Sequence, residues 1–126
     1  MLAKAIRFAA TGGPEVLEYV DVEVGAPGPG EALVRQHAIG LNFIDVYYRT
    51  GLYPQPLPSG LGREGAGVVE AVGEGVTHVQ PGDRVAYAGG PLGAYASVRT
   101  MPARFLVKLP DAIGFETAAA MMLQGL

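Results

Sequence analysis

Turn-forming residues interrupt this chain so often that long helices are not expected over most of its length. Of its 126 residues, 19 are glycine and 10 are proline, yet 49% of the chain is hydrophobic. Glycine and proline favour turns, and apolar runs between turns are typical of short strands that share one core. The chain therefore predicts a mainly β fold of one domain, and not a helix bundle.

Several short strands are predicted between these turns. Residues 17–24 alternate apolar and polar side chains with a period of two, which is typical of a half-buried strand. A second strand is expected over residues 32–41, with Arg35 and His37 on its solvent side. The other extended segments are expected at 67–72, 84–88, 94–99 and 105–109, with a shorter piece between the turns at 73–75 and 81–83. Six or seven such strands predict a closed or partly open barrel.

One short helix is expected inside this β pattern. Asn42 can cap its first turn, Asp45 stands three residues later as in a capping box, and Gly51 can end it. The proline-rich run at 53–58 can be neither helix nor central strand. An ordered loop is therefore expected after the helix.

Composition argues against several functional classes. The net charge is −3 and the chain has no basic run, so nucleic acid is not expected as a partner. The absence of cysteine excludes disulfide scaffolds, cysteine nucleophiles and thiolate zinc sites. No apolar stretch approaches the ~18 residues of a membrane span, and Lys4 and Arg7 leave no signal peptide at the N-terminus. We expect a cytoplasmic protein with no membrane partner.

Residues 115–126 predict a helix that is apolar around most of its circumference. From Ala118 to Leu126, Gln124 is the one polar side chain. Such a helix must be covered by other protein. Two interpretations follow: the helix leads toward a further domain of a longer chain, which we favour, or it docks on the barrel's own core.

Residues 60–65 match the G-x-G-x-x-G fingerprint of dinucleotide-binding domains. That fingerprint requires a strand before it and a helix after it, so that a pyrophosphate meets the N-terminus of the helix. Here a proline-rich loop precedes the glycines and the predicted strand at 67–72 follows them. We therefore interpret these glycines as turns at a corner of the barrel.

Six segments of the chain together resemble one enzyme family. They are residues 12–17, 38–47, 49–54, 65–73, 81–85 and 118–126. In these segments the chain resembles the zinc-independent quinone oxidoreductases of the medium-chain dehydrogenase/reductase superfamily, relatives of zeta-crystallin. The run Asn-Phe-Ile-Asp-Val-Tyr at 42–47, followed by Gly-Leu-Tyr-Pro at 51–54, is the most specific part.

The resemblance implies both a fold and an activity. The resemblance implies a parent protein of two domains, a GroES-like barrel followed by a Rossmann domain with the NADPH fingerprint. The parent protein is expected to be a homodimer. We therefore expect a GroES-like, partly open barrel with one or two short helices over residues 1–114. Residues 115–126 would begin the linking helix toward the nucleotide-binding domain. NADPH would reduce a small-molecule quinone without metal, and the chain without that domain is expected to be inactive.

The resemblance also bears on zinc. Zinc-dependent relatives place a cysteine where Asn42 stands and a histidine where Arg63 stands. Neither replacement preserves a ligand, because arginine is always cationic and would repel a divalent ion. No zinc is expected.

Candidate site residues follow from the same likeness. The nicotinamide end of NADPH would be approached by Asn42, Phe43, Ile44, Asp45, Tyr47 and Gln124. The quinone would be contacted by Tyr47, Tyr53 and Arg63. The catalytic candidates are Tyr47, Tyr53 and Asn42. The two tyrosine hydroxyls can hydrogen-bond a quinone oxygen, and Asn42 would line the slot between nicotinamide and quinone.

The tyrosines also have ordinary structural interpretations. Tyr47 and Tyr48 can be core residues with their hydroxyls at the rim, as tyrosines commonly are. Tyr53 can pack within its own loop. We favour a site role for Tyr47 and packing for Tyr48, and both interpretations of Tyr53 stay open.

The other candidates have ordinary interpretations too. Asn42 can be a helix cap alone, Arg63 can form an ion pair with Glu64, and Gln124 can face solvent. His37 and His78 fit exposed strand or turn positions, and we assign them no chemistry.

Three alternative functions compete with quinone reduction. Zinc-independent relatives that reduce the double bond of enones or alkenals would use the same slot. A ring-forming co-chaperonin uses the same barrel. A third alternative is a ligand-binding or interaction module whose bare terminal helix pairs with a second copy.

Overall fold

The computed structural model describes residues 2–40, 43–53, 55–57 and 59–121. Eight strands are assigned in these ranges: β1 (Leu2–Phe8), β2 (Leu17–Glu23), β3 (Glu31–Ile39), β4 (Ser59–Gly60), β5 (Glu64–Val72), β6 (Arg84–Ala88), β7 (Val98–Pro102) and β8 (Val107–Lys108). The helices are α1 (Phe43–Thr50) and α2 (Phe115–Met121), with single 3₁₀ turns at Pro14–Val16 and Ala103–Phe105. The prediction of a mainly β fold with few short helices is confirmed.

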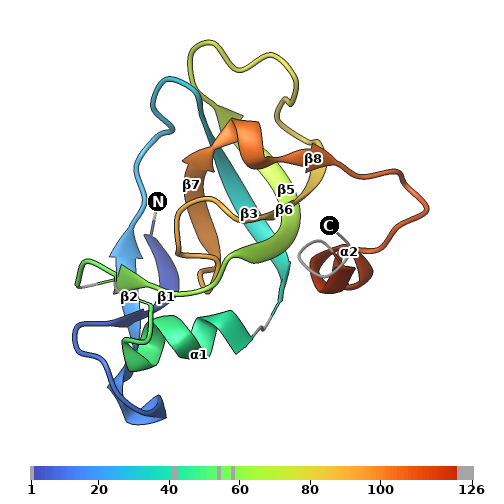
Figure 1. Ribbon diagram of the computed structural model, residues 1–126. Coiled ribbons are helices and arrows are strands. Elements are labelled where there is room, and N and C mark those ends of the chain that lie inside the picture. Colours follow the sequence, from blue (N-terminus) through green and yellow to red (C-terminus); the bar gives the residue numbers. More distant parts are fainter. Residues whose placement is uncertain (1, 41–42, 54, 58, 122–126) are drawn as a thin grey trace.

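The strands form two antiparallel sheets. The smaller sheet has the order β2-β1-β4, and the larger has the order β7-β3-β5-β6-β8. Strands β1 and β2 follow one another in the chain and lie side by side in the smaller sheet, and β5 and β6 do the same in the larger sheet. Antiparallel pairing permits such direct connections. Figure 1 shows α1 beneath the strands and α2 against one side of the larger sheet.

Backbone hydrogen bonds join the two sheets along β1. The Ile6 amide donates to the Tyr95 carbonyl at 2.8 Å, and the Ser97 amide donates to the Lys4 carbonyl at 2.8 Å. An isolated bridge pairs Ala5 with Ala96 between these bonds. The sheets therefore curve into a partly open barrel, as predicted, and not a closed one.

The main core fills the space that the larger sheet encloses. Its buried side chains come mostly from strands and their connections: Ala32, Val34, Val69, Val79, Val85, Tyr87, Ala94, Met101, Ala103 and Leu106. Tyr87 brings a hydroxyl into this core, where the Gln36 Nε2 atom donates to it at 2.6 Å. A buried polar group is stabilised only when it has such a partner.

Several predicted elements match the structure and others are displaced. The strands at 17–24 and 84–88, the helix after position 42 and the loop after Gly51 are all present. The strand predicted at 94–99 is wrong in position, since β7 spans Val98–Pro102, and 105–109 contains only the two-residue β8. The predicted extended piece between 75 and 81 is not a strand.

The N-terminal strand β1 escaped the sequence pattern. Its residues Leu2, Ala3, Ala5 and Ile6 are apolar on both faces, so the period of two is hidden. The buried positions are Ala3 and Phe8, while Leu2 at the start of the strand is exposed. Burial in β1 therefore follows no simple alternation, because Ala3 and Phe8 stand at positions of opposite parity and both are buried.

The glycines at 60–65 lie at a corner, as the sequence predicted. Gly60 ends β4 and strand β5 begins at Glu64, so no helix follows them. Gly62 has a φ of 95°, which glycine adopts without strain. The turn places its backbone against the ring of Tyr95.

Helix α2 packs against the larger sheet. Its Ala118 and Ala119 are buried in a cluster with Ala66 of β5 and Ala86 of β6. The approach to the helix is held by Arg84, whose guanidinium donates to the carbonyl oxygens of Pro110 at 3.0 Å and Ile113 at 2.7 Å. The barrel itself therefore covers this face of the predicted terminal helix.

Within the described ranges, neither helix has the length and apolar character that crossing a membrane would require.

Candidate active site at helix α1

Helix α1 and the loop after it bring three tyrosines together. The Tyr47 and Tyr53 rings meet edge to face with centroids 5.4 Å apart, and Tyr48 meets Tyr53 in the same way at 5.7 Å. The loop folds back through Gly51, whose φ of 89° is accessible to glycine. The Tyr53 amide then donates to the Tyr47 carbonyl at 3.2 Å. Helix and loop therefore hold the rings of Tyr47 and Tyr53 as a pair.

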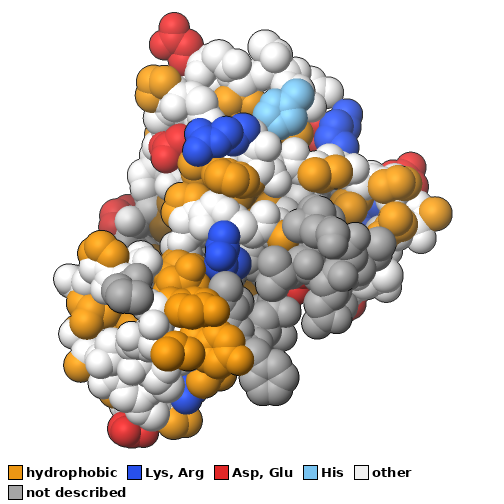
Figure 2. Space-filling view, in the orientation of Figure 1, with side chains coloured by type: hydrophobic (Ala, Val, Ile, Leu, Met, Phe, Trp, Pro, Cys, Tyr) orange, Lys and Arg blue, Asp and Glu red, His pale blue; other side chains and the backbone are white. Residues whose placement is uncertain are grey.

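Two of these tyrosines remain accessible. Tyr47 is 37% exposed and Tyr53 is 44% exposed, and Val46, Leu52 and Leu57 are exposed apolar neighbours along the same segment. Figure 2 shows hydrophobic side chains gathered over α1. Tyr47 is therefore not a core residue, whereas Tyr48 is half-buried and packs on Tyr53. Exposed apolar clusters of this kind often mark a ligand or partner surface.

Asp45, the capping-box candidate of the first turn, is buried. It is only 3% exposed, and its Oδ2 atom accepts a hydrogen bond of 2.6 Å from the Tyr95 hydroxyl. Its position in the first turn of α1 is also favourable for a carboxylate near the helix dipole. The buried contact fixes the start of the helix to the segment before β7.

Tyr95, whose carbonyl accepts a hydrogen bond from Ile6 of β1, supplies the other half of this contact. Burial, and then the hydrogen bond and negative charge of Asp45, raise the pKa of Tyr95 well above its ordinary value, so the hydroxyl stays a donor. Its ring covers Gly62, where an added Cβ would lie 2.4 Å from the ring's Cδ1 atom. Sequence reasoning missed Tyr95, because a lone tyrosine between alanines carries no signal for a partner 50 residues away.

A second acidic side chain that sequence reasoning missed is Glu64. It is 1% exposed, and its carboxylate lies against Gly40, where an added Cβ would be 1.9 Å from Oε1. The Gly40 amide donates to the Glu64 carbonyl at 3.0 Å. A buried carboxylate therefore lies beside Gly40, shortly before α1. The sequence placed Glu64 in a turn, where a charged side chain is usually exposed.

Arg63 does not form the ion pair with Glu64 that was considered as its ordinary role. Its Nε atom is buried without a hydrogen-bond partner among the described residues, and its guanidinium lies beside Gly89. Adjacent residues entering a strand point to opposite faces, which separates the two side chains. No hydrogen bond or ion pair within the described ranges joins Arg63 to Tyr47 or Tyr53.

Four candidate residues cannot be placed at the side-chain level. Asn42 and Gln124 lie outside the described residues. For Phe43 and Ile44 the structure describes the backbone, in the first turn of α1, and not the side chains. The proposed roles of all four stay predictions.

The described part of the chain holds no group of three or more His, Asp or Glu side chains that could bind a metal ion. The two histidines are engaged elsewhere. The His37 ring stacks on Phe115 with centroids 4.5 Å apart, and His78 Nε2 lies 2.9 Å from the Ala103 carbonyl oxygen.

The chemistry that this site offers is binding and hydrogen bonding. Two flat, accessible rings can contact a flat conjugated ligand, and tyrosine hydroxyls can donate to an oxygen on that ligand. The buried Asp45–Tyr95 contact holds the helix to the segment before β7. These features make α1 and the loop after it a candidate binding surface for a flat ligand.

Comparison with known proteins identifies the class. The model of the alcohol dehydrogenase GroES-like domain matches residues 28–111. The chain belongs to the alcohol dehydrogenase GroES-like domain family, as its fold predicted.

Particular relatives are quinone oxidoreductases. The chain is 65% identical over 126 residues to the quinone oxidoreductase of Pseudomonas aeruginosa. The matched region covers 99% of this chain and 39% of that protein. The crystal structure of the quinone oxidoreductase of Pseudomonas syringae pv. Tomato matches with a TM-score of 0.95 at 66% identity, over 98% of this chain and 38% of that one. The Escherichia coli quinone oxidoreductase complexed with NADPH matches with a TM-score of 0.95 at 53% identity, over 97% and 38%.

The chain therefore spans about two fifths of the length of these relatives. The predicted resemblance to quinone oxidoreductases is confirmed. The comparisons do not favour the enone-reductase, co-chaperonin and interaction-module alternatives.

Proposed function

We propose that residues 1–126 form the substrate side of an NADPH-dependent quinone reductase. The observation that carries this proposal is the exposed, mutually packed pair of Tyr47 and Tyr53, held at one end of a barrel that is 65% identical to the matching part of a quinone oxidoreductase. A quinone is flat and carries two carbonyl oxygens, which suits two rings with hydroxyl donors.

In this proposal the residues of α1 bind and orient the quinone. The ring of Tyr47 or Tyr53 contacts the quinone face, and a hydroxyl donates to the carbonyl oxygen on which negative charge develops during reduction. NADPH, when bound, supplies the hydride. The Asp45–Tyr95 contact holds α1 in place, so that the rings keep their positions as the ligand binds.

The fit of NADPH to this chain is limited to its reactive end. Phosphates require a cradle of backbone amides or cations, and the described G-x-G-x-x-G segment enters a strand instead of a helix. Asn42, Phe43, Ile44, Asp45 and Gln124 are the proposed contacts of the nicotinamide end. Asp45 would contribute mainly by positioning, because its carboxylate is buried against Tyr95.

We propose that residues 1–114 are the catalytic domain and that residues 115–126 begin the link to a nucleotide-binding domain. The length of the relatives supports this division, since this chain matches 39% of the Pseudomonas aeruginosa protein. The family resemblance further supports a cytoplasmic homodimer. Sedimentation of the full gene product would measure its oligomeric state, and a monomer would overturn the dimer.

The proposal is tested by the full product of the encoding gene. We expect para-benzoquinone to be reduced with loss of NADPH absorbance, faster than an activated alkene such as methyl vinyl ketone. Faster turnover of the alkene would favour the double-bond reductase alternative. No turnover with any of several quinones would refute the proposal.

Removal of the Tyr47 hydroxyl tests its proposed role. We expect Tyr47→Phe to lower kcat/KM for the quinone about tenfold, which corresponds to about 1.4 kcal/mol of lost transition-state stabilisation. Tyr19→Phe is the matched control, because Tyr19 is an exposed tyrosine of β2 outside the site. Equal kcat/KM values for the two variants would show that the Tyr47 hydroxyl does not contact the substrate.

A further inference from the structure

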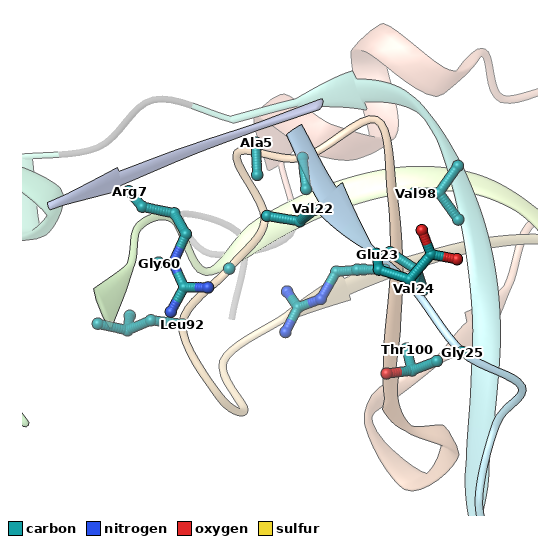
Figure 3. A pocket seen from close by; sticks show the side chains of 13 residues that line it. Ala5, Arg7, Val22, Glu23, Val24, Gly25, Gly60, Leu92, Val98 and Thr100 are labelled. Carbon is teal, nitrogen blue, oxygen red and sulfur yellow. The ribbon is translucent and has the colours of Figure 1, made fainter. Parts of the chain in front are cut away.

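A cavity lies between β1, β2, β7 and the loop before β7. It measures about 300 Å³, and its lining is mixed, with apolar side chains such as Val22, Leu92 and Val98 and the two guanidinium groups of Arg7 and Arg99. Figure 3 shows Arg7 beside Leu92 at one side of this cavity. None of the lining residues belongs to α1 or its tyrosines.

Arg99 is a buried cation with neutral partners. It is 7% exposed, and its guanidinium donates to the Pro91 carbonyl oxygen at 2.9 Å and to the Tyr87 hydroxyl at 3.4 Å. Within the described ranges no carboxylate lies within ion-pair distance of it. A buried charge is costly unless it is paired, and a guanidinium has five N–H donors, of which these contacts use two.

Arg7 adds a second cation without a counter-ion. It is half-buried in β1, and the described residues provide no ion pair to its guanidinium. The Glu23 carboxylate also borders the cavity, but Figure 3 shows it on the side opposite to the Arg7 guanidinium. The Arg7 end of the cavity therefore presents a guanidinium next to an apolar wall.

We propose that this cavity binds a small organic carboxylate. The carboxylate would accept charge-assisted hydrogen bonds from Arg7 and Arg99, whose planar groups suit two-oxygen acceptors. The apolar body of the ligand would contact Val22, Leu92 and Val98. A volume of about 300 Å³ is at the lower end for ligand pockets, so the ligand is compact.

Benzoate and benzamide are the matched probes, because they share one shape and differ in charge. In calorimetric titration of the full gene product at constant ionic strength, we expect saturable binding of benzoate and at least tenfold weaker binding of benzamide. Inorganic phosphate tests whether charge alone suffices, and we expect it to bind more weakly than benzoate. Phosphate binding as tight as benzoate, or equal binding of benzamide, would overturn the proposed ligand class.

Two variants test whether benzoate binds at this cavity. We expect Arg7→Gln to weaken benzoate at least tenfold, whereas Arg104→Gln, which removes an equal charge from the 3₁₀ turn Ala103–Phe105, leaves it unchanged. Arg7 is chosen because it is only half-buried and its loss should spare the fold, whereas Arg99 also holds Pro91 and Tyr87. Absence of saturable benzoate binding, or an equal loss in both variants, would overturn the site. Quinone reduction is a separate measurement, so either proposal can fail alone.

Discussion

Gly67→Ala is expected to destabilise the protein by about 3 kcal/mol, the upper part of the range for overpacked interiors. Gly67 lies within β5, paired with Val85 of β6 and with Gln36 of β3. A Cβ at this position would lie 2.1 Å from the carbonyl oxygen of Arg35. That oxygen belongs to backbone, which cannot rotate away as a side chain can. The register of β3 on β5 shifts directly after Gln36, so the close approach belongs to the irregular pairing itself.

Urea unfolding of Gly67→Ala beside Gly25→Ala measures this effect. An added Cβ at Gly25 meets nothing within 4 Å, so this control should change the free energy of unfolding by less than about 0.5 kcal/mol. Equal stabilities of the two variants would mean that β3 and β5 separate easily at this point, contrary to the close packing described above.

Tyr95→Phe is expected to cost about 2 kcal/mol, because it removes a charge-assisted hydrogen bond to the buried Asp45 carboxylate. The hydroxyl that is removed lies 2.6 Å from Oδ2 of Asp45, which is only 3% exposed. Tyr19→Phe removes a hydroxyl from an exposed ring of β2 and should leave stability nearly unchanged. A similar loss in both variants would contradict the special role of the Asp45 contact.

The same contact predicts a pH dependence of known sign. Burial and Asp45 raise the pKa of Tyr95 in the folded state, so folding favours the neutral hydroxyl. A tyrosine in the unfolded chain loses its proton near pH 10, so this stabilisation is complete below about pH 10 and declines as the pH rises above it. Tyr95→Phe cannot titrate. The difference in unfolding free energy between the protein and this variant should therefore be constant up to about pH 9 and smaller at about pH 11. A constant or growing difference would contradict the assignment.

Helix α1 shows how far local signals reach. Gly51 at its end and the proline-rich loop after it are properties of neighbouring residues, and both predictions hold in the structure. The partner of Asp45 is Tyr95, which is 50 residues away in the chain. The sequence therefore indicated a helix with an acidic first turn, and only the folded barrel shows that this acid is buried.

The strand predictions also hold where the signal is local and fail where burial depends on distant partners. Residues 17–24 alternate clearly because β2 has one wet face and one dry face, and their prediction is confirmed. In β1 apolar side chains stand on both faces, with Ala3 and Phe8 buried and Leu2 exposed. Pairing with β2, β4 and the segment at Ala96 determines that orientation, and none of those partners is visible from the residues of β1 alone.

The sequence by itself determined the mainly β class, the site of the short helix and the resemblance to quinone oxidoreductases, because turns, caps and motifs are local patterns. The tertiary structure alone decided that Tyr47 and Tyr53 form an accessible pair, that Asp45 meets Tyr95, and that Arg7 and Arg99 share a cavity. The physical reason is that a hydrogen bond, a ring contact or a buried charge depends on how helices, loops and strands are placed relative to one another. Their proximity arises only when the two sheets close around a common core.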